Sequence, residues 1–321
     1  MFFLRLAFFS LSVALAAQNS PGKQVAVGGI RLHIRCTGAG SPTVVIESGF
    51  DEFSSDWALV QGGVERFTRV CTYDRAGYGE SAPSPLPRTF SQINLELHEA
   101  LKNAGEHAPY VLLGHSYGGN VARSYAERYP EQVAALMLVE AVPEHQPIMI
   151  GGRPTLIKDF AQGKDIPSPQ VPEQSAPVIG EPSPEEDLPG VYDALPPALR
   201  AIHKSYQRSP ALQQAENGER EWSSEELARW DKQGMAKILG AKPVLVITRA
   251  LENSGGSTDR PDIEARRLRA QAEQMQLSSD SLMIILPVGH DMQLEAPDSV
   301  TAATELVVRS VREHRRLRML K

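Results

Sequence analysis

Residues 111–120 read V-L-L-G-H-S-Y-G-G-N, and the rest of the chain can be interpreted outward from this stretch. The apolar residues 111–113 are typical of a buried strand, and residues 121–129 have the composition of a helix. Between them lies G-x-S-x-G, centred on Ser116, which gives the strand–turn–helix order of a nucleophile elbow. Gly114 and Gly118 would let the strand and the helix pass closely without a side-chain clash. The simpler interpretation is a Gly/Ser turn with no chemical role.

An elbow would give Ser116 a reactive position. Its hydroxyl would project from the carboxyl edge of the sheet, at the N-terminus of the following helix. Free N–H groups and the helix dipole favour a developing negative charge there. We therefore expect Ser116 to be a nucleophile.

The composition excludes several function classes. The chain has 321 residues, of which 41% are hydrophobic, and a formal net charge of −6, which fits one large α/β domain with an insertion or two small domains. No basic block predicts a nucleic-acid partner. The sequence has no phosphate-binding loop and no zinc-ligand spacing. We expect neither a cofactor nor a metal.

The first residues are typical of a secretory signal peptide. Arg5 precedes an apolar run over residues 6–15, and residues 14–16 form an A-x-A cleavage signal. We assign residues 1–17 to the signal peptide and expect a secreted or periplasmic protein. The apolar run is too short to span a membrane comfortably, so no stable anchor is expected after cleavage. The alternative is an uncleaved N-terminal membrane anchor.

Strand and helix patterns alternate through most of the chain, which predicts a mostly parallel sheet covered on both faces. The expected strands are 23–27, 30–36, 43–47, 69–73, 110–113, 131–139, 243–248 and 281–287, with helices at 57–65, 91–104, 262–277 and 296–319. This core comprises residues 21–142 and 241–321.

Residues 143–240 interrupt the alternation and carry no strand signal. We interpret them as an inserted helical cap, Pro-rich over residues 166–197, with helices at 197–207 and 223–239. The second helix would begin at S-S-E-E, residues 223–226. A disordered acidic linker is the alternative for the Pro-rich part.

Two further motifs complete a recognisable set. Residues 74–81 read D-R-A-G-Y-G-E-S, and residues 288–290 read V-G-H. With the elbow, they make the chain resemble the α/β-hydrolase superfamily over nearly its whole mature length, in particular an exported, lid-bearing branch with a YDRAGYG segment. The resemblance implies an α/β-hydrolase fold and the order serine, acid, histidine along the chain.

His290 is the expected base. A serine hydroxyl needs a base within hydrogen-bond reach, and a histidine after the last strand lies at the same sheet edge. We place His115, which precedes the nucleophile, beneath the site. The other histidines fall on faces far from that edge or in the cap.

Two carboxylates compete for the role of triad acid. Glu140 directly follows the strand ending at residue 139, a position that haloalkane dehalogenases in the same superfamily use. Glu252 lies in the loop after the next strand, where most hydrolases of this fold keep an aspartate, but residues 248–253 lack the usual Gly-x-x-Asp pattern. We prefer Glu140 and keep Glu252 as the alternative. Either could instead be a structural carboxylate.

An oxyanion hole needs two backbone N–H donors. The fold implies Tyr117, directly after the nucleophile, and Phe50, in the loop S-G-F at residues 48–50. Asp74 and Arg75 look catalytic, but we expect them to tie loops together.

The chain has two cysteines, Cys36 and Cys71, each in an expected strand. In an oxidising compartment they could form a disulfide, and the alternative is two buried thiols. The resemblance places their two strands side by side, which favours the disulfide.

These observations predict a secreted serine hydrolase that cleaves a small or medium carboxylic ester, with water as second substrate. A serine at the elbow argues against dehalogenase or epoxide hydrolase chemistry, which uses aspartate there. The same triad could cleave an amide, a peptide or a C–C bond, or run perhydrolysis. A catalytically inactive binding protein of the same fold is the alternative from another class.

Overall fold

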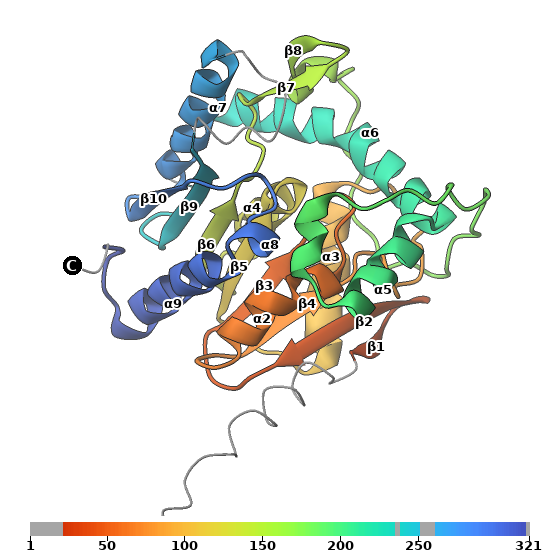
Figure 1. Cartoon of the computed structure of the whole chain (residues 1–321), viewed down its shortest axis with the longest axis horizontal. Helices are drawn as coiled ribbons and strands as arrows, with labels where there is room; N and C mark the ends of the chain where they lie inside the picture. The colour runs from red at the N-terminus through yellow and green to blue at the C-terminus, as the bar shows by residue number, and fades with distance from the viewer. Residues whose placement is uncertain (1–21, 235–237, 251–260, 319–321) are drawn as a thin grey trace, which may run out of the picture.

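The structure is a computed structural model, which describes residues 22–234, 238–250 and 261–318. The predicted signal peptide and Glu252 lie outside the described residues. An eight-stranded sheet forms the centre of the molecule, with helices on both faces (Figure 1). Its order is β1 (Lys23–Val27), β2 (Ile30–Thr37), β4 (Val70–Tyr73), β3 (Thr43–Glu47), β5 (Tyr110–His115), β6 (Val133–Val139), β9 (Val244–Arg249) and β10 (Ser281–Leu286).

The sheet is parallel from β4 to β10, and β1 and β2 join it through antiparallel pairing. The central strands are buried along their whole length, as their continuous apolar runs predict for a sheet covered on both sides. Alternate residues of β5 show the two faces: Leu112 joins one apolar cluster, and Val111 and Leu113 join the other.

Each face is covered by its own pair of helices. Helices α3 (Phe90–Ala104) and α4 (Tyr117–Arg128) pack on the first cluster, and α2 (Ala58–Val64) and α9 (Pro297–Glu313) on the second. The remaining core elements are η1 (Ser54–Trp57), α7 (Pro261–Glu273), η4 (Gln274–Leu277) and α8 (Met292–Glu295). This confirms the predicted α/β architecture.

The closing helix is shorter than predicted. It ends at Glu313 rather than near residue 319, because His314 adopts a left-handed conformation with φ 49° and its N–H bonds back to the carbonyls of Ser310 and Val311.

The insertion contains two strands that the sequence interpretation missed. Strands β7 (Pro147–Ile150) and β8 (Arg153–Leu156) form an antiparallel hairpin, so the expectation of no strand in residues 143–240 is wrong. Gly151 and Gly152, with φ of 56° and 76°, supply the positive dihedrals that a tight hairpin turn needs. The other cap elements are η2 (Ile157–Phe160), η3 (Gly190–Ala194), α5 (Pro197–Gln207) and α6 (Pro210–Gln233).

Helix α6 begins at Pro210, well before the predicted start at residue 223. Ser209 is its N-cap, since its hydroxyl accepts from the N–H of Ala211, and Pro210 occupies the first helical position. The S-S-E-E segment therefore lies in the middle of α6. In Figure 1 this helix and the hairpin run across the top of the view, beyond one end of the sheet.

Cys36 and Cys71 face each other across the antiparallel pair of β2 and β4 and form a disulfide. The two strands are neighbours in the sheet, as the resemblance implied.

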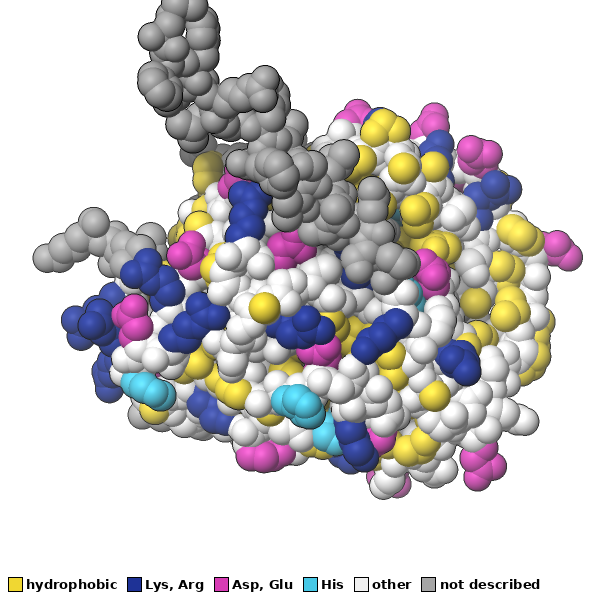
Figure 2. Space-filling view, turned by 90° about the horizontal axis from the view of Figure 1, so that it is seen from below, with side chains coloured by type: hydrophobic (Ala, Val, Ile, Leu, Met, Phe, Trp, Pro, Cys, Tyr) yellow, Lys and Arg dark blue, Asp and Glu magenta, His cyan; other side chains and the backbone are white. Residues whose placement is uncertain are grey.

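The molecular surface seen from below shows basic and acidic side chains interspersed over most of that face (Figure 2). In the part of the chain that the structure describes, no helix combines the length and apolar character needed to cross a membrane.

Candidate active site

Ser116 sits in a strained turn between β5 and α4. Its φ of 51° and ψ of −122° lie in a region that residues with a side chain rarely adopt. The backbone holds this conformation at both ends: the Ser116 N–H donates to Val139 O at 3.1 Å, and the Gly119 N–H donates to Ser116 O at 3.1 Å. This is the predicted elbow, with the serine as N-cap of α4.

The glycines of the elbow allow the close packing that the sequence suggested. A Cβ on Gly114 would lie 2.4 Å from Gly118 O, and one on Gly118 would lie 2.3 Å from the carbonyl oxygens of both Glu47 and Ser48. Helix α4 therefore contacts the end of β3 directly, and larger residues would push the two apart.

The loop after β3 lies against the nucleophile. A Cβ built on Gly49 would be 3.2 Å from Cβ of Ser116, so the backbone of residues 48–50 borders the serine. The next residue, Phe50, stacks its ring on that of Tyr117 with centroids 4.2 Å apart. The structure thus brings the two predicted oxyanion-hole residues together beside Ser116.

Arg75 holds this loop in place. Its guanidinium donates to Ser48 O at 2.6 Å and to Gly49 O at 2.9 Å. The same group pairs with Glu47 at 3.1 Å and with Glu219 of α6 at 2.8 Å. All three charged side chains are buried, so Arg75 joins the loop beside the nucleophile to the cap.

Asp74 also holds neighbouring loops together. Its carboxylate accepts from the backbone N–H groups of Ser54 and Glu80 and pairs with His33 at 3.0 Å. These contacts fit the structural roles expected for Asp74 and Arg75.

His290 lies in the loop between β10 and α8, at the same end of the sheet as Ser116. Burial, the positive charge of His115, and the charges of Arg249 and Arg267 lower the pKa of His290 to about 3, against a smaller opposing effect of Glu52. The imidazole is therefore neutral at neutral pH, the form that accepts a proton.

Glu140, the preferred triad acid, follows β6 with φ 44° and is fully buried. Its Oε1 accepts from Arg249 at 2.6 Å and from Arg267 at 3.0 Å. Its Oε2 accepts from the Thr248 hydroxyl and the Arg249 N–H, at 2.8 and 2.9 Å. Among the described residues these are the hydrogen bonds of the carboxylate, and none of them goes to His290. Glu252 lies outside the described residues, so the choice of acid stays a prediction.

Sequence reasoning missed a buried pair directly behind the site. His115 Nδ1 donates to Glu52 Oε1 at 2.5 Å, and His115 Nε2 donates to the backbone oxygen of His290 at 2.9 Å. The sequence placed His115 beneath the nucleophile but gave no signal that Glu52, 63 positions away, would meet it.

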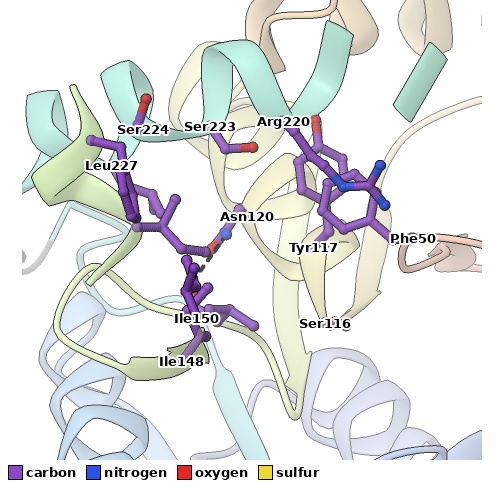
Figure 3. A pocket seen from close by; sticks show the side chains of 13 residues that line it. Phe50, Ser116, Tyr117, Asn120, Ile148, Ile150, Arg220, Ser223, Ser224 and Leu227 are labelled. Atoms are coloured by element: carbon purple, nitrogen blue, oxygen red, sulfur yellow. Dashed lines mark hydrogen bonds between the residues drawn. The ribbon is translucent and has the colours of Figure 1, made fainter. Parts of the chain in front are cut away.

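A cavity of about 500 Å³ opens onto Ser116 from the cap. Apolar side chains dominate its wall, with a few polar groups among them. The lining residues are Phe50, Ser116, Tyr117, Asn120, Val142, Ile148, Ile150, Ile157, Phe160, Arg220, Ser223, Ser224 and Leu227. Figure 3 shows α6 contributing Ser223, Ser224 and Leu227 on one side, and β7 contributing Ile148 and Ile150 on another. Its size and lining suit a small organic ligand.

The family model described as "Alpha/beta hydrolase family" matches residues 37–304, which is most of the chain. The chain belongs to the alpha/beta hydrolase family. The matched range includes the elbow, the loop after β3 and His290, so every described part of the candidate site lies within the hydrolase region.

Curated relatives of this hydrolase match over shorter stretches. A 2-hydroxymuconate semialdehyde hydrolase of Pseudomonas sp. (strain CF600) is 29% identical over 140 residues, which is 42% of this chain and 50% of the relative. The match spans only 36% to 41% of the length of three other curated relatives.

Solved structures share the fold over nearly the whole chain. A thermophilic esterase from Thermogutta terrifontis superposes with a TM-score of 0.61 and 18% identity, covering 91% of this chain and 99% of the esterase. The epoxide hydrolase CorEH gives a TM-score of 0.60 and 14% identity, covering 88% and 96%. At these identities the likeness establishes the hydrolase fold and not the reaction.

Proposed function

We propose that this hydrolase is a serine esterase that cleaves a small or medium carboxylic ester through an acyl-enzyme. One observation carries the proposal: Ser116 stands in a strained elbow at the start of α4 and faces an apolar cavity of about 500 Å³. A hydrolase that used aspartate as nucleophile would need a carboxylate at this position.

We assign each step of the proposed reaction to one of these groups. The Ser116 hydroxyl attacks the ester carbonyl and passes its proton to His290. The N–H groups of Tyr117 and Phe50 stabilise the oxyanion, each worth roughly 3 kcal/mol. His290 then protonates the departing alcohol, and water attacks the acyl-enzyme by the same route in reverse.

The low pKa of His290 explains why a third residue is needed. An imidazole with a pKa of about 3 is a weak base. A carboxylate bonded to its other nitrogen would raise that pKa and stabilise the imidazolium that forms. We assign this task to Glu140, whose carboxylate would exchange one of its partners Arg249, Arg267 and Thr248 for His290, with Glu252 as the alternative.

The cavity supports an apolar substrate. Its wall offers several aliphatic side chains and few polar groups, so it favours an ester with an uncharged acyl or alcohol part. We further propose export through residues 1–17. The Cys36–Cys71 disulfide supports an oxidising compartment, since such bonds are rare in the reducing cytosol.

C–C bond hydrolysis on the same triad is the second candidate. The relative named 2-hydroxymuconate semialdehyde hydrolase supports it, because that name describes a substrate with neither an ester nor an amide. The residues around Ser116 and His290 are compatible with either bond.

A fluorophosphonate probe and a p-nitrophenyl ester series test the proposal. We expect the probe to label Ser116, and short to medium acyl esters to be hydrolysed. Ser116→Ala should abolish both while leaving the circular dichroism spectrum unchanged. Residual turnover within about tenfold of the wild type would exclude Ser116 as nucleophile, because such a loss is far smaller than triad serines show. Labelling without ester hydrolysis would favour the second candidate.

A further inference from the structure

The buried pair of Glu52 and His115 connects three parts of the site. Glu52 comes from the loop after β3, His115 ends β5 immediately before the nucleophile, and His290 belongs to the loop after β10. Glu52 Oε2 accepts from the Gly49 N–H at 2.8 Å, and Glu52 Oε1 accepts from His115 at 2.5 Å. His115 in turn donates to His290 O at 2.9 Å.

Both nitrogens of His115 face acceptors, one a carboxylate oxygen and the other a carbonyl oxygen. The pKa of Glu52 is lowered, which keeps its carboxylate ionised. A neutral imidazole has only one N–H, so both bonds to these acceptors form only when His115 is an imidazolium. The side chain is fully buried, and Glu52 is its counter-ion. The charge of Glu52 and its hydrogen bond raise the pKa of His115 to about 9 against the opposing effect of burial.

This imidazolium lies next to the proposed base. The ring centroids of His115 and His290 are 4.8 Å apart. Other charged groups also act on His290, from every side of the site. They are Glu52 from the loop after β3, Arg249 from β9 and Arg267 from α7, and Asp291 is the next residue in its own loop. Glu140 and Glu264 partly offset the two arginines through their ion pairs.

We propose that Glu52 and His115 are a positioning pair for the reaction, which rests on the proposed hydrolase function. The pair fixes the Gly49 backbone beside the oxyanion-hole loop and holds the His290 loop against the nucleophile strand. Its cationic ring also keeps His290 neutral. Neither residue lines the substrate cavity, so the effect reaches the substrate through Phe50 and His290.

His115→Gln and Glu52→Gln test this role. The glutamine at position 115 retains a donor for His290 O but loses the charge and one bond, and the glutamine at position 52 removes the counter-ion. We expect kcat to fall roughly tenfold to a hundredfold with KM nearly unchanged, because small displacements of the reacting groups slow the chemical step. In His115→Gln the acid limb of kcat/KM against pH should move upward by about one to two pH units, because a positive charge beside His290 is lost while Glu52 remains. Glu52→Gln also removes a carboxylate that raises the pKa of His290, so its shift should be smaller.

His33→Gln is the matched control. His33 also forms a buried ion pair, with Asp74 at 3.0 Å, but it lies on β2, and the polar partners of its ring are Asp74, Ser54 and Glu80. We expect a comparable loss of stability with the wild-type pH profile. If His115→Gln leaves the acid limb where the wild type has it, or if His33→Gln shifts it equally, the proposal is wrong.

Nuclear magnetic resonance of isotope-labelled histidine in the Ser116→Ala chain reports the protonation state of each imidazole. This measurement requires neither enzymatic activity nor a stable His115 variant. We expect the resonances assigned to His115 to be those of an imidazolium near neutral pH with both N–H protons protected from exchange, and those of His290 to be those of a neutral ring. A neutral His115 would overturn the proposal. If the wild type neither hydrolyses esters nor reacts with the probe, the esterase function fails, while this reading still decides the state of the pair.

Discussion

Glu140 illustrates how one residue can have a structural role and an expected catalytic one. Its carboxylate is the counter-ion of two buried or half-buried arginines, and it is also the preferred triad acid. The glutamine variant separates these roles, since a lost triad acid lowers kcat and a lost counter-ion lowers stability.

We predict that Glu140→Gln lowers kcat by about four orders of magnitude if Glu140 orients His290, because an amide there favours the wrong tautomer. As a counter-ion alone, it would instead cost about 3–5 kcal/mol of unfolding free energy with kcat nearly unchanged. Ester hydrolysis and urea unfolding of Glu140→Gln and Glu252→Gln distinguish these cases. A crippling effect of Glu252→Gln alone would assign the acid to Glu252.

Single residues were predictable from the sequence where a local motif marks them. Ser116 and the elbow glycines follow from G-x-S-x-G, and His290 follows from its place after the last strand. The Glu52–His115 contact has no such signal, because it forms only when the sheet brings the ends of β3 and β5 together. Its chemistry depends on tertiary packing.

At the scale of elements, the contact of α4 with the end of β3 sets the shape of the oxyanion site. Gly118 lies at this contact, and a Cβ added to it would fall 2.3 Å from two carbonyl oxygens. Gly62 in α2 is a useful comparison, since a Cβ there has nothing within 4 Å.

We predict that Gly118→Ala lowers kcat by roughly a hundredfold, because the loop carrying Phe50 must move away from Ser116. It should also destabilise the fold. Gly62→Ala should leave kcat unchanged and stabilise the protein by about 0.5–1 kcal/mol, as expected inside a helix. Hydrolysis rates and urea midpoints of the two variants provide the check. Equal rates for Gly118→Ala and the wild type would show that the loop tolerates the displacement.

Elements of the core were predicted better than those of the cap. Continuous apolar strands and amphipathic helices such as α3 have strong periodic signals, and their bounds matched closely except at the end of α9. The β7–β8 hairpin is too short for such a signal, and the Gly-Gly turn was its one marker. The start of α6 was misplaced because S-S-E-E has the pattern of a capping box, whereas Ser209 and Pro210 actually begin the helix.

At the scale of the whole molecule, His115 and His290 make the unfolding free energy depend on pH. The pKa of His115 is raised from 6.5 to about 9, so the folded chain holds this proton more tightly than the unfolded chain. The resulting stability is fully present below pH 6.5 and is lost as the pH rises through 9. The lowered pKa of His290 has its effect at acidic pH. The unfolded chain binds this proton more tightly than the folded chain, so the unfolding free energy decreases as the pH falls from 6.5 towards 3.

We predict that the unfolding free energy of the wild type declines between pH 6.5 and 9, with up to about 3 kcal/mol from His115. His115→Gln should be less stable below this window and should lack that part of the decline. Urea unfolding at several pH values measures both slopes. The same decline in the two proteins would mean that His115 does not hold a proton in the folded state.

The disulfide acts on the whole chain because it links β2, the second strand of the sheet, to its neighbour β4. Cys36 and Cys71 are 35 positions apart, and cross-linking them restricts the unfolded chain. The chain-entropy model gives such a loop roughly 3–4 kcal/mol. The sulfurs lie across a pair of strands whose register places the two residues opposite each other, so the folded sheet accommodates the link.

We predict that the protein purified under oxidising conditions contains no free thiol, and that reduction lowers its unfolding free energy by roughly 3–4 kcal/mol. Mass analysis after alkylation in denaturant, with and without reductant, decides the first point, and urea unfolding under both conditions decides the second. The Cys36→Ser/Cys71→Ser double variant is the control, because its stability should not respond to reductant. Two alkylated cysteines without reductant would rule the bond out. If the disulfide is present but its reduction leaves the unfolding free energy unchanged, the β2–β4 pairing alone restrains this part of the chain.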